Sequence, residues 1–277
     1  MTILLLTLYI LIGAYCAGLL GSLTGLGGGI VIIPLLTLVL DVDIHYAIGA
    51  SLVSVIATSS GSAAAYVKEG ITNMRLGMFL EIATTLGAVA GAFLSTYIPA
   101  QYIAIVFGVI LIFSAIMSLK KKNINADPVS SKPAQFLRLG SSYPDQGQQI
   151  QYGVRNVFGG FGLMSFAGMI SGLLGIGSGS LKVIAMDNVM RIPFKVSTTT
   201  SNFMMGVTAA ASAVVYLQRG YIDPGLSMPV MLGVVFGAMT GSKILVKAKS
   251  KSLKIIFAIV ISVLAIQMIY KGLSGNI

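Results

Sequence analysis

Long apolar stretches, most of them the length of a membrane-spanning helix, fill most of the chain and recur in the same order. The first series covers residues 2–22, 30–40, 46–67, 74–96 and 101–119. After a polar segment, the second series covers residues 154–174, 180–190, 196–217, 226–247 and 253–270. Because most of these runs are long and nearly free of charge, they predict membrane helices rather than the strands of a barrel.

Two of these runs are much shorter than the others, and a glycine-rich stretch precedes each of them. Gly25-Leu26-Gly27-Gly28-Gly29 comes before residues 30–40, and Gly175-Ile176-Gly177-Ser178-Gly179 comes before residues 180–190. Consecutive glycines weaken a helix, and a helix of this length extends about 16 Å, roughly half of a hydrocarbon core. The pattern predicts broken helices at both stretches. Whether the short runs cross the membrane or re-enter stays open.

The two series repeat one another at a constant offset of 150 residues, without a gap. The matching positions are Gly18 and Gly168, Gly25 and Gly175, Gly27 and Gly177, Gly29 and Gly179, Ser51 and Ser201, Tyr66 and Tyr216, Gly70 and Gly220, Gly87 and Gly237, and Gly91 and Gly241. So many matches predict two structural repeats, a feature of secondary transporters. The predicted organisation is a first membrane repeat at 1–119, a polar connector at 120–152 with no core of its own, and a second membrane repeat at 153–277.

The positions of the basic residues predict how the two repeats are oriented. Six Lys or Arg lie between Lys120 and Arg155, which predicts a cytoplasmic connector because basic loops stay on that side. Five more lysines crowd the turn between the last two runs: Lys243, Lys247, Lys249, Lys251 and Lys254. That turn should also be cytoplasmic, whereas its equivalent around Pro99 should lie outside. The halves are therefore predicted to be inverted, with both termini outside and about 8–10 membrane segments.

Composition excludes several classes of protein. Of the 277 residues, 56% are hydrophobic and 9% are charged, whereas soluble domains carry about 25% charged residues. The net charge of +10 comes mainly from loops between apolar runs, so it predicts membrane orientation and not nucleic-acid binding. Cys16 is the single cysteine, which leaves no intrachain disulfide, and its expected role is packing.

Catalytic chemistry has no support in the sequence. No nucleophile, base and acid are grouped, and neither a metal site nor a phosphate-binding loop is recognisable. We therefore predict a non-enzymatic protein without a cofactor. The single histidine, His45, is expected to form a solvated outer turn with Asp41 and Asp43. The first apolar run has no positive region before it and is expected to be a retained membrane segment rather than a signal peptide.

The glycine stretches are the first candidates for binding. A short helix that starts at a break presents free backbone N–H groups and a partial positive charge, which suit an anion. This interpretation makes substrate-binding candidates of Gly25, Gly27, Gly28, Gly29, Gly175, Gly177, Ser178, Gly179 and Ser180. The alternative is close helix packing, which fits better for the glycines spaced four apart, Gly87, Gly91, Gly237 and Gly241.

Hydroxyl and amide side chains open the run at 196–217. Six polar residues in a row, Ser197-Thr198-Thr199-Thr200-Ser201-Asn202, cover every face of a helix, so some must face the interior. Thr200, Ser201 and Asn202 are candidate donors to the oxygens of an anion, as is Ser51 in the equivalent place of the first repeat. The alternative is that these hydroxyls bond back to carbonyls of their own helix.

Two charged residues lie within apolar runs, where a charge is costly unless it is paired or lines a water-filled path. Lys182, opposite Ile32 in the first repeat, is a candidate to neutralise a substrate anion; the alternative is snorkelling to the cytoplasmic interface. Glu81, about two turns into the run at 74–96, is a candidate to carry a coupling proton or to pair with a basic residue. Its alternative is an interfacial carboxylate.

Together these residues resemble the sulfite exporter TauE/SafE family of membrane transport proteins. The resemblance rests on Gly25-Leu26-Gly27-Gly28-Gly29-Ile30 with Pro34, on Gly49-Ala50-Ser51-Leu52, on the second glycine stretch, and on Thr199-Thr200-Ser201. Gly70 and Gly220 close equivalent runs in the same manner. The similarity covers both membrane halves, roughly 5–118 and 153–271, but not the connector.

The resemblance implies transport of small sulfur-containing anions such as sulfite, sulfoacetate and other organosulfonates across the cytoplasmic membrane. A small anion and the lipid bilayer are the expected partners, and alternating access is the expected mechanism. Ser178, Ile184 and Lys182 depart from the first copy, so the identity of the anion is not carried over. Direction, coupling to protons or other ions, and oligomeric state stay open. The alternatives are an anion-selective channel, or a membrane subunit that recruits a soluble sulfur-metabolism partner.

Overall fold

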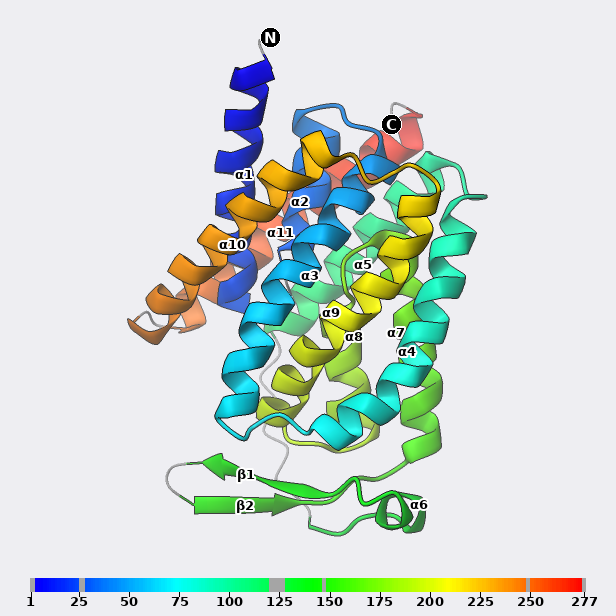
Figure 1. Ribbon diagram of the computed structural model, residues 1–277, viewed down its shortest axis with the longest axis vertical. Helices are drawn as coiled ribbons and strands as arrows, with labels where there is room; N and C mark the ends of the chain where they lie inside the picture. The colour runs from blue at the N-terminus through cyan, green and yellow to red at the C-terminus, as the bar shows by residue number, and fades with distance from the viewer. Residues whose placement is uncertain (1–2, 25–27, 120–127, 146–147, 248–249, 276–277) are drawn as a thin grey trace.

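The protein is a bundle of helices with a small hairpin at one end (Figure 1). The computed structural model describes residues 3–24, 28–119, 128–145, 148–247 and 250–275. The first half of the bundle contains α1 (Ile3–Thr24), α2 (Gly29–Pro34), η1 (Leu35–Val39), α3 (Ile44–Lys68), α4 (Met74–Ser95) and α5 (Ala100–Leu119). The second half contains α7 (Val157–Leu174), α8 (Gly179–Ile184), η2 (Ala185–Val189), α9 (Phe194–Gln218), α10 (Pro224–Lys247) and α11 (Ser250–Ser274).

The two halves have matching elements at the offset seen in the sequence. α2, η1, α3 and α4 begin at residues 29, 35, 44 and 74, and α8, η2, α9 and α10 begin at residues 179, 185, 194 and 224. Each short run is thus six residues of α-helix followed by a single π-helical segment of five. These are the short helices that the lengths of the apolar runs predict at 30–40 and 180–190.

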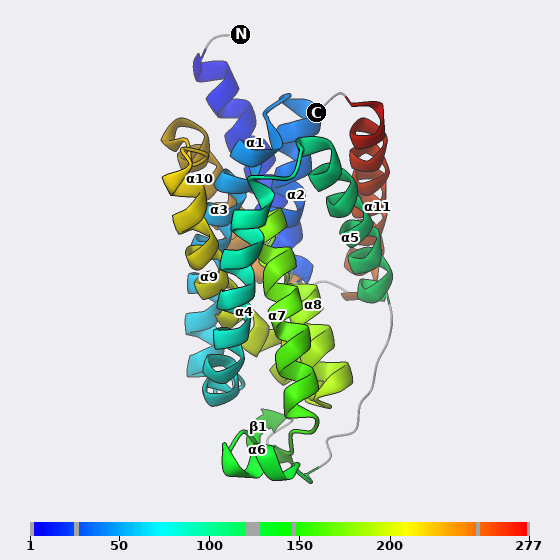
Figure 2. The same cartoon turned by 90° about the vertical axis from the view of Figure 1, so that its right-hand side faces the viewer.

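Helices from opposite halves form the closest pairs of the bundle. α1 packs along α10, and α4 packs along α7; α3 crosses α9, and α5 lies against α11. The first two pairs stand side by side in Figure 1, and Figure 2 shows α5 and α11 together on one flank. The long helices α1, α3, α4 and α5 of the first half therefore have their main packing partners in the second half.

Glycines bring the paired backbones together, and their contacts are reciprocal. A Cβ added at Gly18 of α1 would lie 2.2 Å from the carbonyl oxygen of Val234 in α10. At the equivalent Gly168 of α7, it would lie 2.1 Å from the carbonyl oxygen of Thr84 in α4, which is the equivalent of Val234. Gly87 likewise faces Ser165, and Gly237 faces Tyr15. Small residues allow such contact between membrane helices.

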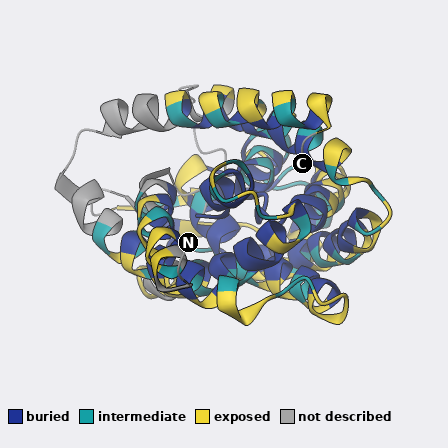
Figure 3. Cartoon of the chain, turned by 90° about the horizontal axis from the view of Figure 1, so that it is seen from above, coloured by how far each residue is buried: buried dark blue, intermediate teal, exposed yellow. Residues whose placement is uncertain are grey.

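The composition of the helices fits a lipid environment. Among the described residues, four helices are long and apolar enough to cross a membrane: α3, α4, α7 and α9. Five further helical segments give shorter apolar stretches, in α1, α2 with η1, α5, α10 and α11. Seen from above in Figure 3, buried residues fill the middle of the bundle and exposed ones lie on its outer faces. The exposed side chains include large apolar ones such as Leu86 of α4 and Ile266 of α11, which suit contact with lipid.

In its described part, residues 128–145 and 148–152, the connector is more ordered than the sequence suggests, and its buried residues belong to a core that it shares with the helices. After α6 (Lys132–Phe136), the strands β1 (Ser141–Asp145) and β2 (Gln148–Tyr152) form an antiparallel hairpin. Tyr143 and Tyr152 are buried in one apolar cluster with Leu76 of α4. The Asn73 amide donates to Tyr152 Oη (2.9 Å), and burial raises the pKa of the Tyr152 phenol to about 12. The polar composition of the connector did not predict this burial, because two tyrosines, Tyr143 and Tyr152, are enough to attach the hairpin to α4.

The hairpin and the chain ends lie at opposite ends of the bundle. Figure 1 and Figure 2 place β1, β2 and α6 beyond one end of the helices, and the start of α1 and the end of α11 at the other. α1 runs towards the hairpin end, whereas its counterpart α7 starts there and runs away from it. α4 and its counterpart α10 also run in opposite directions.

The backbone contact at Gly168 gives a stability prediction. Gly168→Ala should lower the free energy of unfolding by about 1–3 kcal/mol, because the new methyl group meets a backbone carbonyl that cannot move aside alone. Gly162→Ala on the same helix is the matched control, since a Cβ there meets nothing within 4 Å. Thermal unfolding in lipid nanodiscs measures both. Equal stability of the two variants would contradict glycine-mediated packing of α7 on α4.

Candidate functional site

The second glycine stretch breaks the helix through its backbone conformation. α7 ends at Leu174, and α8 begins at Gly179. Between them, Gly175 (φ 65°), Gly177 (φ 71°) and Ser178 (φ 47°) take left-handed conformations. Glycine adopts this region at little cost, which explains positions 175 and 177, whereas a serine there is strained.

The first break differs from the second. Gly25 and Gly27, both candidate binding residues, lie outside the described residues. Gly28 has φ −68°, a right-handed value, at the position where the second break has the left-handed Ser178. The two breaks therefore have related sequences but different backbones at this step.

The start of the first short helix lies beside the second break, and hydroxyls from α3 and α9 bind carbonyls at the second break. Ser51 Oγ donates a hydrogen bond to the carbonyl oxygen of Gly175 (2.8 Å), which joins α3 to the second break. Ser201 Oγ donates to the carbonyl oxygen of Gly179 (3.1 Å), which joins α9 to the start of α8. A Cβ added at Gly29 would lie 2.5 Å from Ser51 Oγ and 3.4 Å from the Gly175 oxygen. Candidate residues from both repeats thus converge here.

Other candidate residues face different parts of the bundle. Ser180 Oγ lies 3.0 Å from Ser114 Oγ of α5. Thr200 Oγ1 accepts a hydrogen bond from the backbone N–H of Asn73 (3.1 Å), at the start of α4 near the hairpin. Asn202 is buried on α9. Ser178 Oγ is buried and has no hydrogen-bond partner among the described residues.

Lys182 reaches the interior of the bundle and joins a chain of polar atoms. Its side chain is 0% exposed, and its Nζ donates to Thr208 Oγ1 of α9 (2.5 Å). Thr208 Oγ1 in turn donates to Glu81 Oε1 of α4 (2.7 Å). The ammonium therefore sits among α4, α8 and α9, and not at an interface where snorkelling would place it.

Glu81 completes this chain, and half of its carboxylate has no partner. Oε1 also lies within hydrogen-bonding distance of Thr85 Oγ1 (3.2 Å). Oε2 is buried and has no hydrogen-bond partner among the described residues. A buried acceptor without a donor is costly, so Glu81 Oε2 is a point where a proton or a donor from a ligand would lower the free energy.

The charged chain occurs once and not twice. The positions equivalent to Lys182, Thr208 and Glu81 in the other half are Ile32, Thr58 and Met231. The helices of the two halves thus pack in the same way, whereas the side chains at these three positions differ between the halves. Thr208 is the member that the sequence did not single out, because a lone threonine in an apolar helix usually bonds its own backbone. The only feature of the sequence that pointed to Thr208 was that a lysine within an apolar run requires a polar partner.

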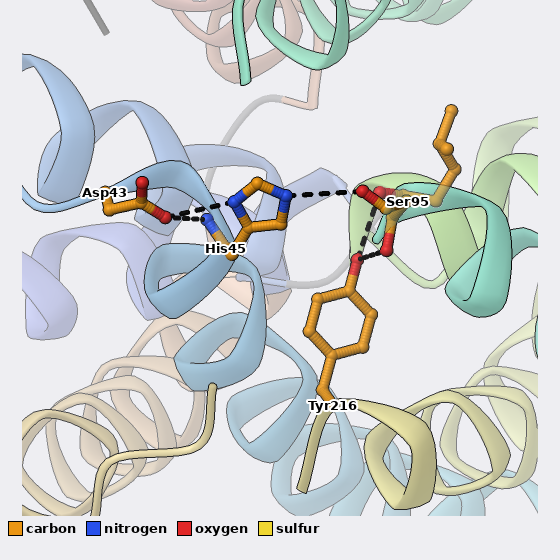
Figure 4. A network of polar contacts seen from close by, with 5 residues as sticks. Asp43, His45, Ser95 and Tyr216 are labelled. Carbon is orange, nitrogen blue, oxygen red and sulfur yellow. Dashed lines mark hydrogen bonds and ion pairs between the residues drawn. The ribbon is translucent and has the colours of Figure 1, made fainter. Parts of the chain in front are cut away.

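A second polar network lies at the end of the bundle where the chain termini are (Figure 4). His45 Nδ1 lies 3.1 Å from Asp43 Oδ1, and His45 Nε2 lies 3.3 Å from the carbonyl oxygen of Ser95. Tyr216 Oη donates to Ser95 Oγ (2.8 Å), which links α9 to the end of α4. The expected solvated turn is thus correct for the exposed Asp43 but not for His45, whose ring turns inward. Both ring nitrogens face acceptors, so a neutral ring donates to only one of them.

A largely helical membrane protein with two short buried helices and a buried, charge-balanced chain of side chains has the architecture of a membrane transporter. The comparisons agree. Residues 10–268 match the family described as sulfite exporter TauE/SafE, and the chain belongs to this family. Family and relatives indicate membrane transport, a function that is not enzymatic.

The curated relatives carry the same class of name. The chain is 30% identical over 264 residues to "Probable membrane transporter protein YunE" of Bacillus subtilis (strain 168), covering 93% of this chain and 95% of the relative. It is 27% identical to YdhB of the same organism, covering 84% and 88%. It is 25% identical to MJ0441 of Methanocaldococcus jannaschii, covering 96% of both chains. No solved structure matches the chain.

The bridging role of Thr208 gives a second prediction. Thr208→Val keeps the shape of the side chain but leaves Lys182 Nζ and Glu81 Oε1 without their shared partner. It should destabilise the protein by about 1–3 kcal/mol. Thr198→Val on the same helix is the control, because the hydroxyl of Thr198 bonds only the carbonyl of Phe194 in the turn before it. Chemical unfolding in detergent micelles compares the variants. A Thr208→Val protein as stable as the control would mean that the bridge contributes nothing.

Proposed function

We propose that the protein is a secondary transporter that moves small sulfur-containing oxyanions, such as sulfite, sulfoacetate or other organosulfonates, across the cytoplasmic membrane by alternating access. The observation that carries this proposal is the buried ammonium of Lys182, three residues after a helix break, in a chain of the TauE/SafE family. A cation inside an apolar bundle is retained where function needs it.

The chemistry of the site favours an anion with several oxygens. Lys182 supplies a charge-assisted donor, and Ser178 supplies a buried hydroxyl without a protein partner among the described residues. Glycines at 28, 29, 175, 177 and 179 lie against side chains of neighbouring helices, so a ligand can approach this backbone only when those helices move. Ser51 and Ser201 complete the set by holding the carbonyls at the second break. A sulfonate or sulfite presents three oxygens in a compact group that such donors can surround.

The burial of the site favours a carrier over a channel. Ser51, Lys182 and Thr200 are all 0% exposed, so an anion can reach them only after the bundle opens. The apolar hollow of about 340 Å³ between α5 and α11 is lined by none of the candidate residues. An open pore for anions would instead expose its polar lining to water.

The orientation proposed for the chain follows the charge pattern. We place the connector in the cytoplasm and both termini outside, which agrees with their positions at opposite ends of the bundle (Figure 1). The opposite directions of α1 and α7, together with the reciprocal glycine contacts, support inverted repeats related by an axis in the membrane plane. Alternating access would then exchange the conformations of the two halves around the site.

Transport into liposomes tests this proposal. With a pH or sodium gradient imposed and the membrane potential held at zero, purified protein should accumulate at least one anion from a panel of sulfite, sulfoacetate, isethionate and methanesulfonate above its outside concentration, which a channel cannot do. Lys182→Met should weaken the affinity for that anion about 10- to 100-fold, since charge-assisted hydrogen bonds contribute about 1.5–3 kcal/mol. Lys132→Met, at an exposed site in the connector, is the control and should change nothing.

The outcomes separate the alternatives. Flux of an anion only down its gradient would indicate a channel. Loss of transport in both lysine variants would indicate that transport depends on the total positive charge of the protein and not on the site at Lys182. Unchanged affinity in a folded Lys182→Met protein would contradict the site proposed here. No flux of any anion in the panel by the unaltered protein would contradict the proposed function itself.

A further inference from the structure

The chain Lys182–Thr208–Glu81 joins two opposite charges from different halves of the protein. The Lys182 ammonium and the Glu81 carboxylate share one hydroxyl, with separations of 2.5 Å and 2.7 Å from it. The exposed fraction is 0% for Lys182 and 8% for Glu81. In this arrangement the two groups compensate one another, and the charge of the pair sums to zero.

The ionisable groups around Glu81 are few. α7, which packs along α4, carries no ionisable side chain, and α9 carries Lys195 in its exposed first turn and Tyr216 near its other end. η2 carries the buried Asp187, after Lys182 on α8. Among these groups, Lys182 is joined to Glu81 through the shared hydroxyl of Thr208. The charge balance of Glu81 is thus set mainly by Lys182.

This balance has a consequence for an anion that binds at Lys182. A monovalent anion added to a neutral buried pair leaves one uncompensated negative charge, which costs several kcal/mol in an apolar interior. One proton on Glu81 restores the sum to zero. From the shared hydroxyl, the charge balance and the unpartnered Oε2, we infer that Glu81 takes up one proton for each monovalent anion that the protein moves. The inference rests on the proposed function and names its coupling ion.

The geometry indicates where the proton goes. Glu81 Oε1 lies within hydrogen-bonding distance of Thr208 and Thr85, whereas Oε2 is buried without a partner among the described residues. A proton on Oε2 turns this acceptor into a donor, which can bind an oxygen of the anion held by Lys182. Binding of the proton therefore raises the affinity for the anion. By thermodynamic linkage, binding of the anion raises the affinity for the proton by the same factor.

A metal cation in place of the proton fits less well. A hard cation needs about six oxygen ligands. The described surroundings of the Glu81 carboxylate offer three hydroxyl oxygens, those of Thr84, Thr85 and Thr208, which is fewer than such a cation needs. The single charged chain also sets the stoichiometry, because the equivalent positions Ile32, Thr58 and Met231 provide no second carboxylate.

Proton movement in liposomes provides the test. Methanesulfonate and isethionate are suitable probes because they keep one negative charge over the whole working range of pH. A pH-sensitive dye inside the vesicles should record one proton entering with each anion. An acidic exterior should drive uptake, whereas a membrane potential set with potassium and valinomycin should leave the rate unchanged, since the net charge moved is zero.

Glu81→Gln is the decisive variant, because glutamine resembles the protonated carboxyl in shape and charge. It should bind the anion without a proton, lose the dependence on pH, and respond to membrane potential. Glu69→Gln, at an exposed site after α3, is the control and should behave like the unaltered protein. Proton uptake by the unaltered protein on mixing with the anion in detergent, followed with an indicator dye, gives a second measurement that does not depend on any variant folding.

Each result decides between the inference and the function on which it rests. Anion uptake without proton movement, or driven by a sodium gradient, would overturn the coupling but leave the transporter in place. A folded Glu81→Gln protein that keeps its pH dependence would also overturn it. Failure of the unaltered protein to move any anion of the panel described above would overturn the proposed function, and the coupling with it.

Discussion

A helix that is interrupted inside a bilayer leaves backbone groups that lipid cannot satisfy, and the rest of this structure depends on meeting that need. The second break is enclosed on all sides by other helices, and its residues from Gly175 to Ser178 are all buried. Hydroxyls of α3 and α9 bind the carbonyls of Gly175 and Gly179. Tyr216 adds a contact from its hydroxyl to the carbonyl oxygens of Gly172 and Leu173, at the end of α7 (3.3 Å each). The long helices therefore form a shell around two short ones.

The two halves share their packing but not their chemistry. Equivalent glycines face equivalent carbonyls across the α1–α10 and α4–α7 pairs, so the shell has the same construction on both sides. At the centre this likeness ends. Ser178 takes a left-handed conformation where Gly28 does not, and Lys182 replaces an isoleucine. A symmetric shell can thus hold an asymmetric site, in which Lys182 and Glu81 are charged whereas their equivalents Ile32 and Met231 are not.

The sequence predicted features that depend on local pattern and on the repeat. The short helices start within a residue of their predicted positions because glycine breaks and run lengths are local properties. The contacts of Gly87 with Ser165 and of Gly237 with Tyr15 fit the packing alternative stated for these glycines. The partners of Lys182 could not be predicted, because Thr208 and Glu81 lie 26 and 101 positions away on other helices. The burial of the hairpin could not be predicted for a related reason. Tyr143 and Tyr152 pack against α4, and the pattern of residues within the connector does not indicate that contact.

The division of the charged pair between the halves bears on how the protein is made. α4 carries Glu81 into the bilayer about a hundred residues before Lys182 is synthesised. Until α8 and α9 arrive, that carboxyl has neither its cation nor the hydroxyl of Thr208, and α4 still lacks the backbone of α7 against its glycines. The first half alone therefore lacks both the packing surface for α4 and the charge that balances Glu81. The second half supplies both, so the two halves depend on one another to complete the bundle.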